Sequence, residues 1–186
     1  MGFALSYKRW RHKKGYGVHS PFAYSLIKDL SAKPGSYYKD KMMSKLMGAK
    51  YTYTHRQGRL LHRLIARLDP SVIVMPEEGY SEEWVIAITF ANSKANIIKD
   101  FPNTPFENVL VVVSAPYVNS HPDEMALLLS CERGILMTFG EPSEIAEARR
   151  FIQHIIPRGW GLIDKKTALF IASSDSPYID YDVKLV

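Results

Sequence analysis

The sequence predicts an α/β protein in which a helical N-terminal lobe precedes a mostly parallel sheet with an antiparallel hairpin at its C-terminal edge. Apolar residues recur at helical spacing through the first 68 residues. From Ser71 onward, short apolar runs alternate with helical segments, a pattern typical of parallel strands joined by crossover helices. The last apolar runs follow one another without a helix between them, which indicates an antiparallel pair.

Residues 1–68 form the predicted basic helical lobe. Serine followed by proline at Ser20-Pro21 is a strong helix start, because serine caps the helix and proline suits its first turn. The amphipathic segment Thr54–Leu68 carries an apolar stripe on one face. The four expected helices lie within Ala4–Lys14, from Ser20 to Pro34-Gly35, over Tyr37–Met47 and over Thr54–Leu68.

Residues 69–186 form the predicted sheet domain, which we expect to pack with the lobe as one unit. Its longest β-branched run, Asn108–Val113, is typical of a strand buried on both faces. The expected strands are Val72–Met75, Asn96–Lys99, Asn108–Val113, Ile135–Phe139, Trp160–Asp164, Ala168–Ala172 and Asp182–Leu185. The expected helices are Ser81–Ala91, Pro122–Cys131 and Ser143–Ile156.

Charge is distributed unevenly along the chain. Residues 1–68 hold 15 Lys and Arg against 2 Asp and Glu, whereas residues 69–186 hold 9 against 17. This division predicts either two functional halves or a basic lobe neutralised by an acidic body. No apolar run has the length of a membrane span, and the N-terminus lacks the apolar core of a secretory signal, so we expect a cytoplasmic protein.

A single cysteine and unpaired histidines exclude several kinds of site. Cys131 cannot form an internal disulfide, and we expect it to be a small core residue. The six histidines show no paired spacing of the His-x-x-x-His kind, so no metal site is predicted. No nucleophile elbow or phosphate-binding glycine loop is present, and the residues themselves identify no catalytic group.

Four stretches are similar to one family. The segment His12–Phe22 resembles a motif that opens a group of bacterial class I S-adenosylmethionine-dependent methyltransferases. Arg59–Leu64 and Asp69–Val74 resemble that group's helix before the sheet and its first strand, and Arg158–Val186 is similar to its closing strands. The resemblance implies a Rossmann-like methyltransferase sheet with S-adenosylmethionine as the cofactor.

The part of the sequence that would bind the cofactor departs from the family's pattern. Such enzymes place a glycine-rich turn after the first strand, so that the main chain can approach the ligand. Here only Gly79 is retained, Pro76 lacks a main-chain donor, and Glu77 and Glu78 bring negative charge where the ligand's carboxylate would lie. Like charges a few ångströms apart cost about 1–4 kcal/mol. The sequence therefore predicts a damaged cofactor pocket around Gly79 and Glu77.

Later positions of the family's site differ as well. Asp100 matches the acidic residue that the family uses to bind the ribose hydroxyls, and a surface aspartate is the alternative interpretation. The family's middle strand ends in Asp with a nearby His, whereas here it ends Val113-Ser114-Ala115-Pro116. The next strand ends in paired aspartates in the family, but Met137–Gly140 has none.

A helix–strand–helix segment of the family is missing after Lys99. Only about eight residues separate Lys99 from Asn108, too few for a crossover helix. The sheet edge left open by this deletion would be an aggregation risk unless it is covered. We expect the N-terminal helices or a second subunit to cover it.

Two further groups are candidates for function. His19 lies in the best-preserved motif and is either functional or a structural residue before a helix cap. The four arginines Arg56, Arg59, Arg63 and Arg67 follow helical spacing and form a possible anion-binding face, with a solvated face as the alternative.

Two functions from different classes fit these features. The first is a degenerate, non-catalytic methyltransferase-like protein, a pseudoenzyme that acts by binding a protein partner, a second copy of itself or a polyanion, with no cofactor. The second is an active methyltransferase that binds S-adenosylmethionine in an altered pocket built on Gly79 and Asp100. RNA or polyanion binding through the basic N-terminal helices is a further alternative. Because a fold does not fix a function, the residues of the site decide between these functions. They favour the first.

Overall fold

The computed structural model describes residues 18, 20–31, 53–76, 82–91, 94, 96–101, 107–131, 133–156 and 158–185. The chain divides into two compact units. One comprises Pro70–Glu77 and Asn96–Val183 and contains the sheet. The other comprises Met1–Asp69, Glu78–Ala95 and Lys184–Val186 and contains helices.

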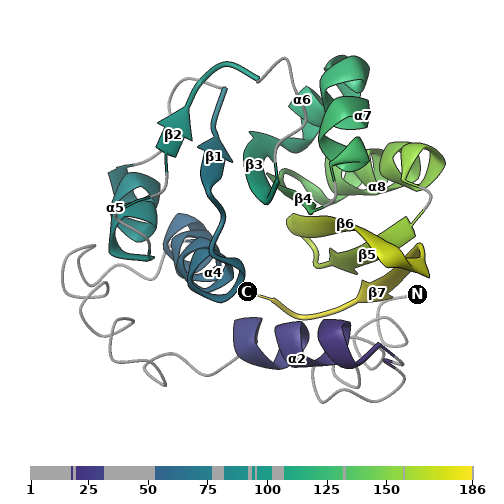
Figure 1. The fold of residues 1–186 in the computed structure, drawn as a ribbon, viewed down its shortest axis with the longest axis horizontal. Helices are drawn as coiled ribbons and strands as arrows, with labels where there is room; N and C mark the ends of the chain where they lie inside the picture. The colour runs from purple at the N-terminus through teal and green to yellow at the C-terminus, as the bar shows by residue number, and fades with distance from the viewer. Residues whose placement is uncertain are drawn as a thin grey trace. The chain divides into compact units, whose positions relative to one another are not determined.

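The sheet has seven strands in the order β2-β1-β3-β4-β6-β5-β7 (Figure 1). The strands are β1 (Val72–Val74), β2 (Asn96–Ile98), β3 (Val109–Ser114), β4 (Gly134–Phe139), β5 (Arg158–Ile163), β6 (Thr167–Pro177) and β7 (Ile179–Asp182). Strands β2, β1, β3 and β4 are parallel, and β6 runs antiparallel between β4 and β5. The predicted α/β fold, its mostly parallel sheet and its antiparallel C-terminal section are confirmed.

The final strand differs from the prediction. The strand predicted over Asp182–Leu185 lies instead over Ile179–Asp182, where β7 pairs parallel with β5 and forms the edge of the sheet beyond the β5–β6 hairpin. Within β7, Tyr181 and Asp182 are buried, whereas Ile179 at its start is exposed. After the strand, the N–H of Val183 still donates to the carbonyl oxygen of Ile163 at 2.8 Å.

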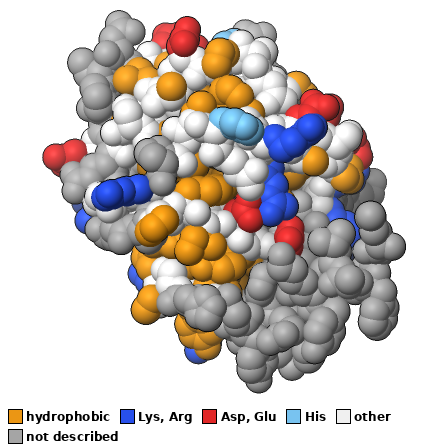
Figure 2. Space-filling model, turned by 90° about the vertical axis from the view of Figure 1, so that its right-hand side faces the viewer, with side chains coloured by type: hydrophobic (Ala, Val, Ile, Leu, Met, Phe, Trp, Pro, Cys, Tyr) orange, Lys and Arg blue, Asp and Glu red, His pale blue; other side chains and the backbone are white. Residues whose placement is uncertain are grey.

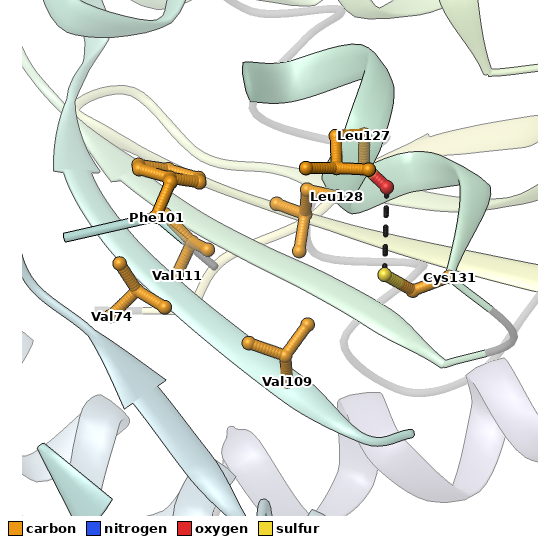
Figure 3. A pocket seen from close by; sticks show the side chains of 7 residues that line it. All are labelled: Val74, Phe101, Val109, Val111, Leu127, Leu128 and Cys131. Carbon is orange, nitrogen blue, oxygen red and sulfur yellow. Dashed lines mark hydrogen bonds between the residues drawn. The ribbon is translucent and has the colours of Figure 1, made fainter. Parts of the chain in front are cut away.

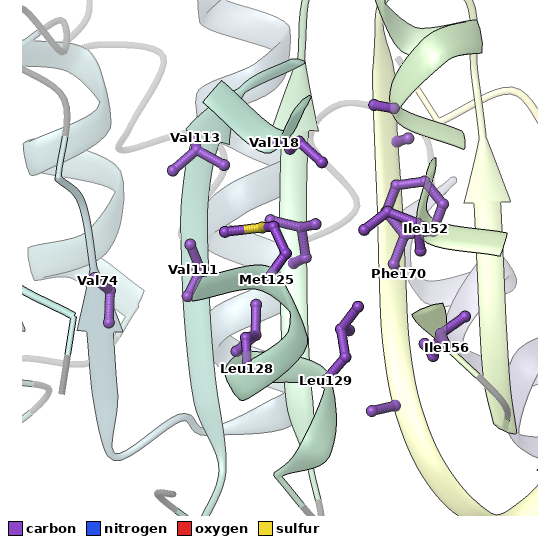
Figure 4. Packing of buried hydrophobic residues seen from close by; sticks show 14 of the residues in the cluster. Val74, Val111, Val113, Val118, Met125, Leu128, Leu129, Ile152, Ile156 and Phe170 are labelled. Atoms are coloured by element: carbon purple, nitrogen blue, oxygen red, sulfur yellow. The ribbon is translucent and has the colours of Figure 1, made fainter. Parts of the chain in front are cut away.

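Three helices of this unit pack on one face of the sheet. They are α6 (Ala115–Ser120), α7 (Pro122–Ser130) and α8 (Pro142–Ile155). The sequence predicts α7 and α8 but not α6, although Ser114 caps α6 by accepting a hydrogen bond from the N–H of Tyr117 at 3.3 Å. Figure 4 shows Met125 and Leu128 of α7 and Ile152 of α8 pointing at strand side chains such as Val111 and Phe170. Cys131 belongs to the same buried cluster, as predicted.

The central strands are apolar on both faces. In β3, the five residues Val109–Val113 are all buried, so successive side chains avoid water in both directions. This confirms the prediction made from the β-branched run. The outer strand β2 is different, because Asn96 and Ile97 are exposed.

The helical unit contains α2 (Pro21–Leu30), α4 (Tyr53–Leu68) and α5 (Glu82–Ala91). Helix α2 begins as predicted, with the Ser20 hydroxyl accepting a hydrogen bond from the N–H of Ala23 at 3.2 Å. Helix α4 packs against both α2 and α5. The predicted apolar stripe of α4 is buried at Leu60, Leu61, Leu64 and Ile65. The expected helices Ala4–Lys14 and Tyr37–Met47 lie outside the described residues.

Within the ranges given above, no helix is both long and apolar enough to cross a membrane.

Candidate functional site at the carboxyl end of the sheet

The parallel strands β1, β2 and β3 end at the same edge of the sheet, where α/β proteins commonly bind ligands. The main chain just after β1 already forms a hydrogen bond within the sheet at this edge. The N–H of Met75 donates to the carbonyl oxygen of Ile98 on β2 at 2.9 Å. The next residue, Pro76, has no N–H to donate. Two successive positions after β1 therefore offer no main-chain donor to a ligand.

The residues that the resemblance assigns to the cofactor are only partly within the described chain. Asp100 follows β2 and is exposed, and its carboxylate has no bonding partner among the described residues. Gly79, Glu77 and His19 lie outside the described residues. The structure therefore places one of the four at the carboxyl edge and does not describe the other three.

An aromatic stack stands beside this edge. The rings of Phe101, which follows β2, and Tyr117 of α6 lie 6.4 Å apart between centroids and 10° from parallel. His121 stacks on Tyr117 at 3.7 Å and 7°. The hydroxyl of Tyr117 donates to Glu124 of α7 at 2.8 Å. The stack thus joins the end of β2 to α6 and α7.

The ring of His121 is held in one orientation by its Nδ1 atom. Nδ1 lies 3.1 Å from the carbonyl oxygen of Tyr117 and 2.9 Å from the hydroxyl of Ser120. In the neutral tautomer that has its proton on Nδ1, this atom donates to the carbonyl oxygen of Tyr117, which can only accept. Nε2 of the neutral ring then carries a lone pair, and it has no partner within the described part of the chain. In this tautomer Nε2 can accept a hydrogen bond from a bound molecule.

Phe101 of this stack also lines a hollow whose lining is entirely apolar (Figure 3). It encloses about 230 Å³ of empty space, part of it open to solvent. Strand residues Val74 and Val111 face Leu128 of α7 across it, and Phe101 and Cys131 complete opposite sides. The thiol of Cys131 contacts the carbonyl oxygen of Leu127 at 3.5 Å. The lining also includes Val109 and Leu127.

The hollow lies on the face where a crossover helix would cover β1. The connection from β2 to β3 passes from one side of β1 to the other, and it spans only residues 99–108. Phe101 in this connection lines the hollow together with Val74 of β1. One aromatic side chain therefore occupies space that a helix fills in an ordinary βαβ unit.

The four arginines of α4 differ in their surroundings. Arg56 is exposed and has no partner among the described residues, whereas Arg59 and Arg63 are buried. Nη1 of Arg63 donates to the carbonyl oxygen of Leu30 at 2.9 Å, at the end of α2. Nε of Arg67 lies 3.0 Å from the carboxylate of Asp29, also on α2. Part of this arginine row therefore holds α2 against α4.

Charges elsewhere on the surface are mixed in sign. Figure 2 shows basic and acidic side chains next to one another on the face that it presents. No group of three or more His, Cys, Asp or Glu able to hold a metal ion occurs among the residues that the structure describes.

The aromatic stack is not predicted by the sequence pattern. The signal for its framework was present, because Ser114-Ala115-Pro116 has the serine cap and early proline of a helix start. A short helix at this point brings Tyr117 and His121 one turn apart on the same side. Nothing in the sequence pattern joins Phe101 to them, since that contact depends on how the connection after β2 crosses the sheet.

Compared with known proteins, the chain matches no protein-family model, and no curated protein matches it either.

Proposed function

We propose that the chain is a methyltransferase-like protein that no longer binds S-adenosylmethionine productively and acts by binding a partner. The main observation in its support is that the turn after β1 has no free main-chain N–H at its first two positions. A cofactor held at such a turn needs free main-chain N–H groups. Here the N–H of Met75 is bonded to Ile98, and Pro76 has none.

The fold supports the first half of the proposal. The antiparallel strand β6 lies between parallel strands near the C-terminal edge, which agrees with the sheet that the resemblance implies. A shared sheet does not carry an activity with it, because function depends on the site built on the fold. Loss of cofactor binding therefore depends on the residues at the carboxyl edge of the sheet.

The hollow beside the turn does not suit the cofactor. The space in it that a bound molecule could occupy is about 10 Å³, room for about one water molecule, against roughly 300–1,000 Å³ in ordinary small-molecule sites. Its lining has no polar group for a ribose, an amino group or a carboxylate, and such groups are costly to bury without hydrogen bonds. Asp100 is the one described residue at this edge whose chemistry matches the family's pattern.

Isothermal titration with S-adenosylmethionine and S-adenosylhomocysteine tests the proposal. We expect no heat of binding and no thermal shift with either compound in the millimolar range. Binding in the micromolar range, lost in Asp100→Ala, would show instead a working pocket of altered form.

A paired variant separates charge from backbone freedom at the turn. Replacing Glu77 and Glu78 together by glycine should restore some affinity if the pocket is dormant, because it removes two negative charges and adds two flexible positions. The matched control replaces both residues by glutamine, which removes the charges alone. An unmodified protein that binds, and loses affinity in the glycine pair, contradicts the proposal.

A further inference from the structure

The two units of the chain carry net charges of opposite sign. The helical unit, with the bounds given above, holds 17 Lys and Arg against 6 Asp and Glu, a net charge of +11. The sheet unit holds 7 Lys and Arg against 13 Asp and Glu, a net charge of −6. The acidic unit is too weakly charged to neutralise the basic one, and the whole chain keeps a net charge of +5. A surplus of this kind favours binding of polyanions by the helical unit.

Part of this positive charge lies on exposed side chains without an ion pair. Lys28 of α2, Arg56 of α4 and Lys184 of the C-terminal segment are exposed, and their side chains have no partner among the described residues. The side chain of Arg67 is 45% exposed although it pairs with Asp29 at 3.0 Å. Four exposed cations therefore stand against one carboxylate.

Hydrogen bonds within the helical unit place three of these cations around α2. Nη2 of Arg67 donates to the hydroxyl of Ser25 at 3.3 Å, so α2 lies beside the last turn of α4. At the C-terminal end of α2, the hydroxyl of Ser31 donates to the carbonyl oxygen of Lys184 at 3.3 Å. Lys28 is exposed on α2 between these two contacts.

Arg56 continues the row of cations along α4. It lies eleven residues before Arg67, which is three turns, so the two side chains share one face of the helix about 16 Å apart along its axis. Between them on this face, Arg63 donates to the carbonyl oxygen of Leu30, the last residue of α2. Helix α2 therefore covers this face from Arg67 to Arg63 and ends before Arg56. A row of this length can contact several phosphates of one nucleic-acid strand.

An exposed tyrosine stands among these cations. Tyr24 is 41% exposed, and its side chain has no partner in the described chain. It lies one turn before Lys28 on α2, so the two side chains are neighbours on the helix surface. Proteins bind single-stranded nucleic acid with this combination, because cations pair with phosphates and unpaired bases stack on an aromatic ring.

We propose that the exposed cations of the helical unit and the tyrosine among them bind single-stranded nucleic acid without sequence preference. The residues of this surface are Tyr24, Lys28, Arg56, Arg67 and Lys184. The inference rests on the partner-binding part of the proposed function and supplies the class of partner. Its failure is distinguishable from a failure of the other part, because loss of cofactor binding is measured separately by calorimetry.

Fluorescence anisotropy with a labelled 20-nucleotide oligouridylate tests the proposal. We expect binding that weakens as the salt concentration rises. Oligodeoxythymidylate should bind as well, because neither phosphate contacts nor stacking need a 2′-hydroxyl. A duplex of the same length should bind more weakly, because its bases are already stacked on one another. Absence of binding to either single strand at low salt overturns the proposal.

A triple variant tests the contacts with phosphate. Replacing Lys28, Arg56 and Lys184 together by glutamine removes three cations that hold no other side chain, so the fold should be unaffected. We expect the affinity for oligouridylate to fall at least about tenfold, and the slope of log K against log salt to become shallower by about 2.

The matched control removes the same charge from the sheet unit. Lys99, Arg150 and Lys165 are exposed there, and replacing all three by glutamine should change the affinity by less than about threefold. Equal losses in the two triple variants overturn the proposal, since net charge alone would then account for binding.

Substitutions of Tyr24 test the stacking contact. Tyr24→Leu keeps an apolar side chain but removes the ring, and it should weaken binding of the single strand by about tenfold. Tyr24→Phe keeps the ring and should bind like the unmodified chain. Equal affinity of the leucine and phenylalanine variants would contradict the stacking role and with it the preference for single strands.

Discussion

Arg149 of α8 binds both carboxylate oxygens of Asp180 on β7, with Nη2 2.6 Å from Oδ1 and Nε 2.8 Å from Oδ2. Its third nitrogen, Nη1, reaches Asp182 at 3.2 Å. The pKa of the guanidinium is raised above its ordinary value, chiefly by the hydrogen bond with Asp180. Such a planar, two-point pair fixes geometry as well as charge. One side chain therefore ties the last helix of the sheet unit to its edge strand.

Removing this arginine should destabilise the protein measurably. Arg149→Ala leaves Asp180 and the buried Asp182 without their cation, so we expect the free energy of unfolding to fall by about 2 kcal/mol. Lys166→Ala is the matched control, because the Lys166–Glu141 pair is equally short at 2.6 Å but mostly exposed. It should cost about 0.5 kcal/mol. Urea denaturation measures the free energy of unfolding of both variants. Equal losses would contradict the conclusion that the Arg149 pairs stabilise the protein more than the exposed Lys166–Glu141 pair does.

Tyr178 provides a test at alkaline pH. Its hydroxyl is buried without a hydrogen-bond partner in the described chain. Burial raises the pKa of Tyr178 above its ordinary value of 10, and the charge of Asp180 raises it further. The unfolded chain therefore loses this proton first as the pH rises past about 10, so the free energy of unfolding falls from there upward.

Tyr178→Phe should separate this effect from other alkaline titrations. At neutral pH the variant should equal or exceed the original in stability, by up to about 1 kcal/mol, because an unsatisfied polar atom is removed. Above pH 10 its advantage should grow, since it lacks the ionisable group. Urea unfolding at the two pH values checks this, and a pH-independent difference would be the contrary result.

The sheet was predictable because its strands carry strong local signals. The buried run Val109–Val113 and the capped helix at Pro142 depend on neighbours in sequence. The position of β7 was not predictable, because Asp180 is set there by Arg149, 31 residues earlier. The aromatic stack was not predictable for the same reason, since Phe101 and Tyr117 are far apart in the sequence and meet only in the folded chain.

The arginines of α4 illustrate a second limit. Helical spacing correctly places them on related faces, but spacing alone cannot say what packs against those faces. Arg63 is buried because Leu30 at the end of α2 presents a carbonyl oxygen to it. Whether the exposed Arg56 binds an anion stays a prediction.

The apolar hollow predicts that two similar substitutions in β3 have opposite signs. Val109 faces the hollow, so Val109→Ile adds a methylene to empty apolar space and should stabilise by about 0.8 kcal/mol. Val112 is fully buried on the other face of the strand, away from the hollow, so Val112→Ile should cost about 1–3 kcal/mol through overpacking. Thermal and urea denaturation compare the stability of the two variants. A loss of stability in both would mean that the hollow cannot take up the added methylene group.

Gly159 in β5 should tolerate no side chain. Its φ of 136° lies where residues with a Cβ are rarely found, and it marks an irregularity in the pairing of β5 with β6. A Cβ there would lie 2.0 Å from the carbonyl oxygen of Ile171, which is main chain and cannot move aside. Gly159→Ala should therefore cost on the order of 3 kcal/mol.

Gly140→Ala is the matched control for this prediction. The nearest atom to a Cβ at Gly140 is Oε2 of Glu144, 2.6 Å away at the free end of a flexible side chain. That side chain can shift, at the expense of its hydrogen bond to the N–H of Glu141, so the loss should be about 1 kcal/mol. Urea denaturation ranks the two variants. If Gly159→Ala is as stable as Gly140→Ala, the strand irregularity is not fixed by the backbone conformation of Gly159.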